Sequence, residues 1–219
     1  MNNLEEQIKL SRKTIIEMLT DRKYITTDII TDLPHELFIK LWAKFTNDST
    51  VFDIECENSI GERIYIKYIK THIISKKKDT IKALKLSKVH KTLCESQDLL
   101  FNDTIIYIIC DTQYADIMTT YEDFIKQNKN AEIFDIKRLL INITKHSYVP
   151  QHIKLSITDV NILKTQLYLQ SIFKLPVISN KDPVARYYNL KHGEVVQIIR
   201  PSRSHGVHIS YRVCSNIEE

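Results

Sequence analysis

Apolar residues near the start of the chain recur every three or four positions, with charged residues between them. This spacing predicts an amphipathic helix that ends near residues 21–23. A second helix is expected in HELFIKLWAKF. Asp32 precedes it and can cap its free amides, and Pro34 fits the start of a helix because it has no amide proton to satisfy. The apolar face of the first helix comprises Leu4, Ile8, Ile15, Met18 and Leu19.

In two later segments, apolar and polar residues alternate at every second position instead. VFDIECE and ERIYIKYI therefore predict strands, joined by a turn at Gly61. TIIYIIC is a continuous apolar run, which is typical of a strand buried on both faces. Strands and helices interleave in this part of the chain, and this order favours an α/β domain over residues 1–145. Further elements are expected over residues 79–93 and 121–129, as helices, and in LLINIT, as a strand.

Residues 146–219 carry denser turn and capping signals and predict a separate, small α+β domain. Ser156 and Asp159 have the spacing of a capping box at the start of a helix. Asp182 followed by Pro183 predicts the start of a second, shorter helix, because aspartate caps free amides and proline needs no donor there.

A hairpin is expected after this short helix. EVVQIIR and the returning VHISYRV are its strands, Gly206 lies in its turn, and Pro201 is expected to end the first strand. EVVQIIR is apolar on both faces, so the small sheet needs two covers, and this segment supplies one. We expect the second cover to be another protein, with Ile198 facing it. The domain is therefore predicted to be a docking module.

Positive charge is concentrated in one segment. The formal net charge is +4, yet residues 67–91 contain nine lysines and a single acid, Asp79. This concentration is typical of a surface that faces a polyanion, and the alternative is a lysine-rich face that contacts only solvent. The lysines are Lys67, Lys70, Lys76, Lys77, Lys78, Lys82, Lys85, Lys88 and Lys91.

Motifs for catalysis are scarce. The chain has only three glycines and no glycine-rich phosphate-binding loop. Two close pairs of histidines lack a cysteine or carboxylate at metal-ligand spacing, which favours surface histidines. Asp53, Glu55 and Lys67 match a metal-dependent nuclease only faintly, because an acid-x-Lys pair is absent from the second strand. We expect no cofactor and no metal.

The compartment is indicated by three further features. The first residues are polar and acidic, and the longest apolar run, residues 105–110, is too short to cross a membrane. The four cysteines are widely spaced, without a C-x-x-C pair. We therefore expect an intracellular protein with reduced thiols and no secretory signal peptide.

Several segments together resemble one protein family. KLPVISNKDPVARYYNLKHGEVVQIIRP and SHGVHISYRVC resemble the C-terminal assembly domain of the fifth subunit of eukaryotic nuclear RNA polymerases, a domain that archaeal polymerases carry as a separate small protein. LLINITKHSYVPQHIKLS resembles the junction of that family's two domains, and SRKTIIEMLTDRKYIT resembles its first helix. The resemblance implies a non-catalytic subunit. Its jaw domain would be restriction-endonuclease-like without the active site, and its assembly domain would pack on the largest subunit.

The jaw of this family directs a Thr-Pro-Ser-Ala loop at downstream DNA. The matching stretch here is DTQYA, in which Thr112 and Ala115 agree while glutamine and tyrosine replace proline and serine between acidic flanks. Acidic flanks repel phosphate, so we expect the lysine segment to contribute more to DNA binding than this loop does. The DNA-facing residues expected are Lys76, Lys77, Lys78, Lys82, Lys85, Thr112 and Ala115. The partner-binding residues expected are Arg186, Tyr187, Val196, Ile198, Arg200, Arg203 and Arg212.

The sequence thus predicts a polymerase subunit that binds the largest subunit, neighbouring small subunits and the phosphates of downstream duplex DNA, with no membrane and no homo-oligomer. Rich use of Ile, Asn and Lys suggests an AT-biased genome and favours a large DNA virus, hence virion and host cytoplasm, over a nuclear enzyme. Two alternatives stay open. A DNA-processing nuclease would need clustered metal-binding acids, and a free-standing transcription adaptor would be stable and active alone.

Overall fold

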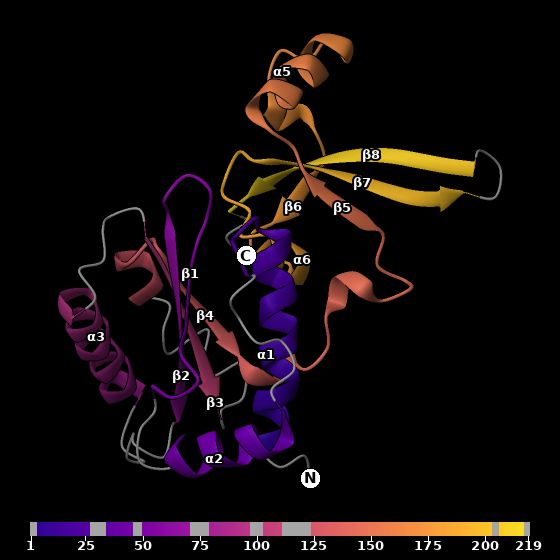
Figure 1. Ribbon diagram of the computed structural model, residues 1–219. Coiled ribbons are helices and arrows are strands. Elements are labelled where there is room, and N and C mark those ends of the chain that lie inside the picture. The colour runs from indigo at the N-terminus through magenta and orange to yellow at the C-terminus, as the bar shows by residue number, and fades with distance from the viewer. Residues whose placement is uncertain are drawn as a thin grey trace. The chain divides into compact units, whose positions relative to one another are not determined.

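The computed structural model describes residues 4–26, 34–45, 50–70, 79–96, 103–110, 124–202 and 206–216, without the side chains of residues 79–85. The chain divides into two compact units, residues 1–141 and 142–219 (Figure 1), a few residues before the expected boundary. Each unit is a mixture of helices and one four-stranded mixed sheet. No described helix combines the length and apolar character needed to cross a membrane.

The first unit has three layers, with its sheet between helices (Figure 1). The strand order is β1-β2-β3-β4, in which β1 and β2 are antiparallel and the other neighbours are parallel. Helix α1 packs on one face, where the Ser11 and Tyr68 hydroxyls are 3.1 Å apart, and α3 covers the opposite face. The strands are β1 (Ile54–Glu57), β2 (Arg63–Lys70), β3 (Thr104–Cys110) and β4 (Ala131–Asp135), and the helices are α1 (Leu4–Asp21), α2 (His35–Phe45) and α3 (Asp79–Ser96).

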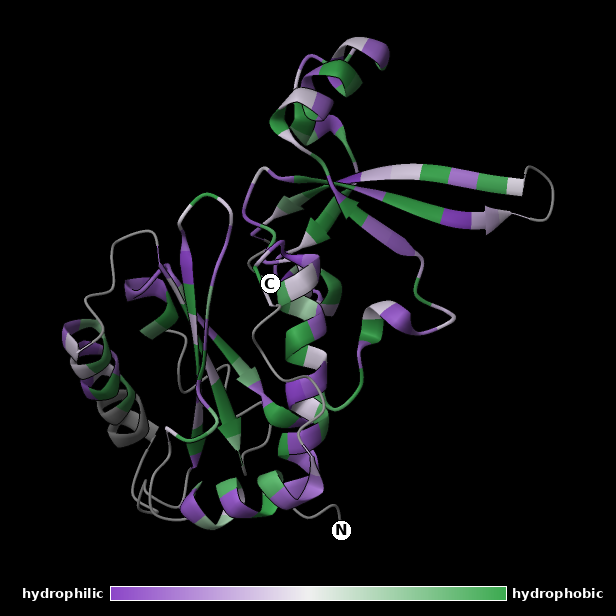
Figure 2. Ribbon diagram, viewed as in Figure 1, coloured by the Kyte–Doolittle hydropathy of each residue, from purple (hydrophilic) through white to green (hydrophobic). Residues whose placement is uncertain are grey.

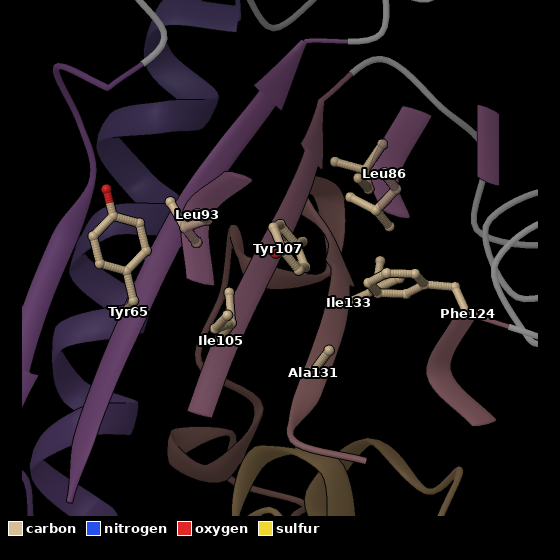
Figure 3. Close-up of a cluster of buried hydrophobic side chains, with 9 residues drawn as sticks. Tyr65, Leu86, Leu93, Ile105, Tyr107, Phe124, Ala131 and Ile133 are labelled. Atoms are coloured by element: carbon tan, nitrogen blue, oxygen red, sulfur yellow. The ribbon is translucent and has the colours of Figure 1, made fainter. Parts of the chain in front are cut away.

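The central strand β3 is buried on both faces, as its continuous apolar sequence predicted. Its alternate side chains Ile105, Tyr107 and Ile109 point toward α3 and pack with Leu86 and Leu93 (Figure 3). The side chains between them face the layer of α1, and this two-sided burial makes β3 the centre of the unit's core.

A histidine of α3 lies at the edge of this core. The His90 Nδ1 atom of α3 is 2.9 Å from the Tyr107 hydroxyl, and its ring packs edge-on against Phe124. Burial lowers the pKa of His90 below its usual value of 6.5, because the charged ring loses hydration.

We expect His90 to make the first unit less stable in mild acid. The lowered pKa means that the unfolded chain binds a proton before the folded one does, so stability falls as pH drops from about 6.5 toward the folded pKa. His90→Gln is expected to flatten this part of the curve of unfolding free energy against pH. An unchanged pH dependence in the variant would show that another group is responsible.

The strand expected in LLINIT is wrong. Ile136–Leu139 (η2) and Ile143–Lys145 (η3) are short 3-10 helices. Asp135 caps the first by accepting from the Lys137 amide, and Asn142 caps the second in the same way. These local hydrogen bonds to the backbone compete with the hydrogen bonds of a strand. The preceding segment AEIFD, which was not predicted as a strand, forms β4.

The second unit is built on a sheet of order β5-β7-β8-β6. β7 is antiparallel to β5 and β8, and β6 is parallel to β8. The strands are β5 (Gln151–Lys154), β6 (Val177–Ser179), β7 (Val195–Ser202) and β8 (Gly206–Ser215), and the helices are α5 (Ile157–Gln166), η4 (Ile172–Lys174) and α6 (Pro183–Tyr187).

Both predicted helix starts in this unit are confirmed. Ser156 and Asp159 form a reciprocal capping box on α5. Asp182 accepts from two amides of α6, at 2.8 and 3.3 Å, and Pro183 occupies its first turn. Pro201 does not end β7, because pairing continues to Ser202. Proline is tolerated there since β5 reaches only to Ile199 and leaves that edge of β7 unpaired.

Candidate docking surface

The two faces of the second sheet are covered by different elements. On one face, Val196 and Ile198 pack with Ala185 and Leu190 around α6. On the other face, Val195 and Val213 pack with Leu163 of α5 and with Leu175, which follows η4. We call these the α6 face and the α5 face.

The orientation expected for Ile198 is corrected by this packing. Its side chain is only 2% exposed, and that of Val196 is fully buried. Both belong to the unit's own core, so neither offers an apolar surface to a partner. The sequence indicated that both faces of β7 are apolar, but not which of them α6 covers.

Among the described residues of the unit, an uncovered apolar surface lies instead on the outer part of the α5 face. β7 and β8 continue beyond α5 as a two-stranded hairpin with green residues along it in Figure 2. Val207 and Ile209 of this hairpin are 58% and 47% exposed, and Ile153 of the adjacent β5 is 38% exposed. Ile199 is paired with Ile209, and Pro201 with Val207. We define Ile153, Ile199, Pro201, Val207 and Ile209 as the apolar hairpin surface.

A pocket of about 350 Å³ adjoins this surface, between α5 and the sheet. Ile153 belongs to both, so the hairpin surface and the pocket are continuous. Exposed aliphatic clusters of this kind mark interaction sites, and an extended hairpin gains stability when a further layer covers it. The pocket is lined by Ile153, Leu155, Asp159, Ile162, Leu163, Gln166, Gln197 and Tyr211.

The other predicted partner residues are dispersed. Arg200 is exposed on the outer hairpin, whereas the Arg212 guanidinium donates to the Val177 carbonyl at 3.2 Å. Tyr187 is buried, and its hydroxyl accepts from the Asn142 amide at 3.1 Å. Arg186 is half-buried on α6, and Arg203 lies outside the described residues.

The predicted DNA-facing residues fall mostly outside the described part of the chain. This applies to Lys76, Lys77, Lys78, Thr112 and Ala115. Lys82 and Lys85 lie on α3, where only the backbone is described. Their contact with DNA stays a prediction.

Asp53, one of the two acids that faintly suggested a nuclease, belongs to an internal ion pair. Asp53 Oδ2 accepts from Lys67 Nζ at 2.9 Å and from the Tyr65 hydroxyl at 2.7 Å. Burial raises the pKa of Asp53, and these hydrogen bonds oppose the rise. Within the described residues, no three His, Cys, Asp or Glu side chains are grouped to hold a metal ion.

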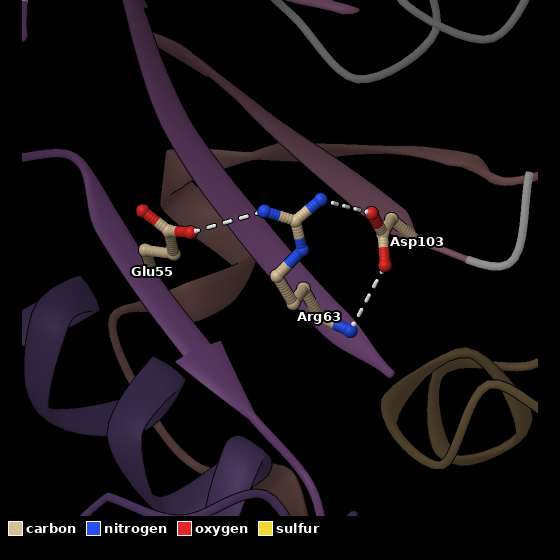
Figure 4. Close-up of polar contacts among 3 residues, drawn as sticks. All are labelled: Glu55, Arg63 and Asp103. Atoms are coloured by element: carbon tan, nitrogen blue, oxygen red, sulfur yellow. Dashed lines mark hydrogen bonds and ion pairs between the residues drawn. The ribbon is translucent and has the colours of Figure 1, made fainter. Parts of the chain in front are cut away.

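Glu55 belongs to a second pair on the same sheet (Figure 4). Arg63 lies 4.0 Å from Glu55 and 2.9 Å from Asp103, whose carboxylate also accepts from the Arg63 amide. Asp103 precedes β3 and binds Arg63 at the start of β2, so it links the two strands. The two residues are 40 positions apart in the chain, and the sequence therefore gives no sign of this contact. These contacts are those of a structural ion pair.

Comparisons with known proteins agree with one another. The profile of the RNA polymerase Rpb5 C-terminal domain matches residues 141–214. The chain is 33% identical over 205 residues to "DNA-directed RNA polymerases I, II, and III subunit rpabc1" of Dictyostelium discoideum, covering 93% of this chain and 94% of the relative. It is 27% identical over 209 residues to the subunit RPABC1 of Caenorhabditis briggsae and of Caenorhabditis elegans, covering 92% of each chain.

Proposed function

The chain belongs to the Rpb5 family of RNA polymerase subunits, and from this premise we propose how it works within the polymerase. The second unit docks on the largest subunit and on neighbouring small subunits. The first unit forms part of the lower jaw near downstream DNA. The apolar hairpin surface carries the docking proposal, because it is an aliphatic surface that the described residues of the second unit leave uncovered.

The subunit contributes scaffolding rather than chemistry in this proposal. Of the acids that faintly suggested a nuclease, the side chain of Asp53 is buried and paired with Lys67 at 2.9 Å, whereas the more exposed Glu55 lies 4.0 Å from Arg63. We assign nucleotide addition and Mg²⁺ to the large subunits. The sheet between helical layers, with parallel β2, β3 and β4, supports a restriction-endonuclease-like jaw.

The lysine segment is the proposed DNA contact of the jaw. Replacing Lys76, Lys77 and Lys78 with glutamine is expected to lower the affinity of the assembled polymerase for DNA at low salt, without changing promoter choice. Each lost phosphate contact lowers the slope of log affinity against log salt by about 0.9. Filter binding over a salt series measures this slope. Equal slopes for variant and wild type, with weaker binding by Thr112→Ala, would favour the DTQYA loop instead.

Purification of the tagged protein from its native source tests the function. Large polymerase subunits are expected to be recovered with it in fixed stoichiometry. A protein recovered alone and active in transcription assays would support the free-standing adaptor. The same preparation tests the proposed compartment, which is the nucleus for a cellular enzyme and the virion for a viral one.

A further inference from the structure

The four strands of the second unit contain no Asp or Glu. Their Lys and Arg side chains lie on the α6 face, because Lys154 and Arg212 are opposite Val196 and Arg200 follows Ile198 by two positions. Arg200 and His208 are opposite one another in the register of β7 and β8, and both are exposed. This face of the outer hairpin is therefore polar and cationic, while the opposite face is the apolar hairpin surface.

The described acids of the unit have other partners than Arg200 and His208. Asp159 completes the capping box of α5, and Asp182 caps α6. Glu194 accepts from Lys154 at 2.7 Å and from the Lys191 amide at 2.8 Å. Residues 142–219 contain ten Lys and Arg against five Asp and Glu, and the other two acids are at positions 218 and 219, outside the described residues.

We propose that an acidic polypeptide segment of the polymerase clasps the hairpin, with apolar side chains on the apolar hairpin surface and carboxylates against Arg200 and His208. This inference rests on the proposed function and adds the chemistry of the partner. Arginine suits the role because its planar fork binds a carboxylate through two hydrogen bonds. Asp159 lines the pocket on the α5 face, so the carboxylates belong on the opposite face of the hairpin.

A polypeptide fits the hairpin better than nucleic acid does. Phosphates would pair with Arg200 but would leave Val207 and Ile209 facing water. Only a partner with both apolar and acidic side chains complements both faces at once.

Carbodiimide coupling identifies the partner group directly. Arg200→Lys keeps the positive charge and supplies a primary amine, which the reagent joins to a contacting carboxylate as an amide. Cross-linking is done in the assembled polymerase, followed by peptide mass spectrometry. The expected product joins the introduced amine to an Asp or Glu of the largest or a neighbouring subunit. Assembled polymerase that yields no such product would overturn the proposal.

Charge reversal provides an independent test. Arg200→Glu with His208→Glu is expected to weaken assembly about tenfold or more, and the deficit should shrink at high salt. Lys174→Glu, an exposed control on η4, should assemble normally. Undiminished assembly of the double variant, or release of wild type by nuclease digestion, would exclude an acidic polypeptide. Wild-type protein that never joins the polymerase would instead refute the proposed function.

Discussion

A subunit that carries Val207→Asp and Ile209→Asp is expected to fold normally and to be absent from the assembled polymerase. Both side chains are about half exposed in the free chain, so the new carboxylates stay hydrated there. Docking would bury them without partners, at a cost of several kcal/mol, roughly enough to abolish a modest interface. Thermal unfolding of the purified variant tests the folding, and its recovery with tagged largest subunit tests the docking.

Ile157→Asp is the matched control for this experiment. Ile157 is 83% exposed in the first turn of α5, where an acid is compatible with the helix dipole. The control is expected to enter the polymerase at the wild-type level. Wild-type recovery of the Val207 and Ile209 variant would show that the apolar hairpin surface is not the docking site.

Ile198→Asp is expected to unfold the second unit. The side chain is buried with Val196, Ala185 and Leu190, so an aspartate there would have no ion-pair partner and little water. We expect a loss on the order of 3–5 kcal/mol in the unfolding free energy of this unit. Hydrogen exchange of residues 142–216 is the suitable measurement, because the only tryptophan, Trp42, lies in the first unit.

Ile198→Val separates packing from charge in the same position. Removing one methylene from a buried isoleucine costs about 0.5–1.5 kcal/mol, so this variant should remain folded and assemble. If Ile198→Asp instead left exchange unchanged and blocked assembly, Ile198 would face a partner, as the sequence alone had suggested.

The features predicted correctly from the sequence are those set by nearby residues. The caps of α5 and α6 depend on side chains within three positions of the amides they bind. The two-residue period of β8 is local in the same sense and places Tyr211 and Val213 on one face and Cys214 on the other; Gly206, expected in the turn, is instead the first residue of β8, with a positive φ. The docking role of the second unit was predicted from the two apolar faces of β7, and it stays a proposal.

Apart from LLINIT, the features predicted wrongly or missed depend on residues far apart. Which face of β7 stays uncovered is decided by where α5 and α6 pack, and the pattern VVQIIR is apolar on both sides. LLINIT has the composition of a strand, yet capping by Asp135 and Asn142 produces 3-10 turns. Asp103 was missed because its partner is on another strand.

Side-chain footprinting of the hairpin, in the free subunit and in the assembled polymerase, tests the central claim most directly. Hydroxyl radicals oxidise exposed aliphatic side chains, so Val207 and Ile209 should be modified in the free protein. We expect assembly to protect both, while the exposed Ile60 of the first unit serves as a reference between the samples. Equal modification of the hairpin in the free and assembled subunit would contradict docking through this surface.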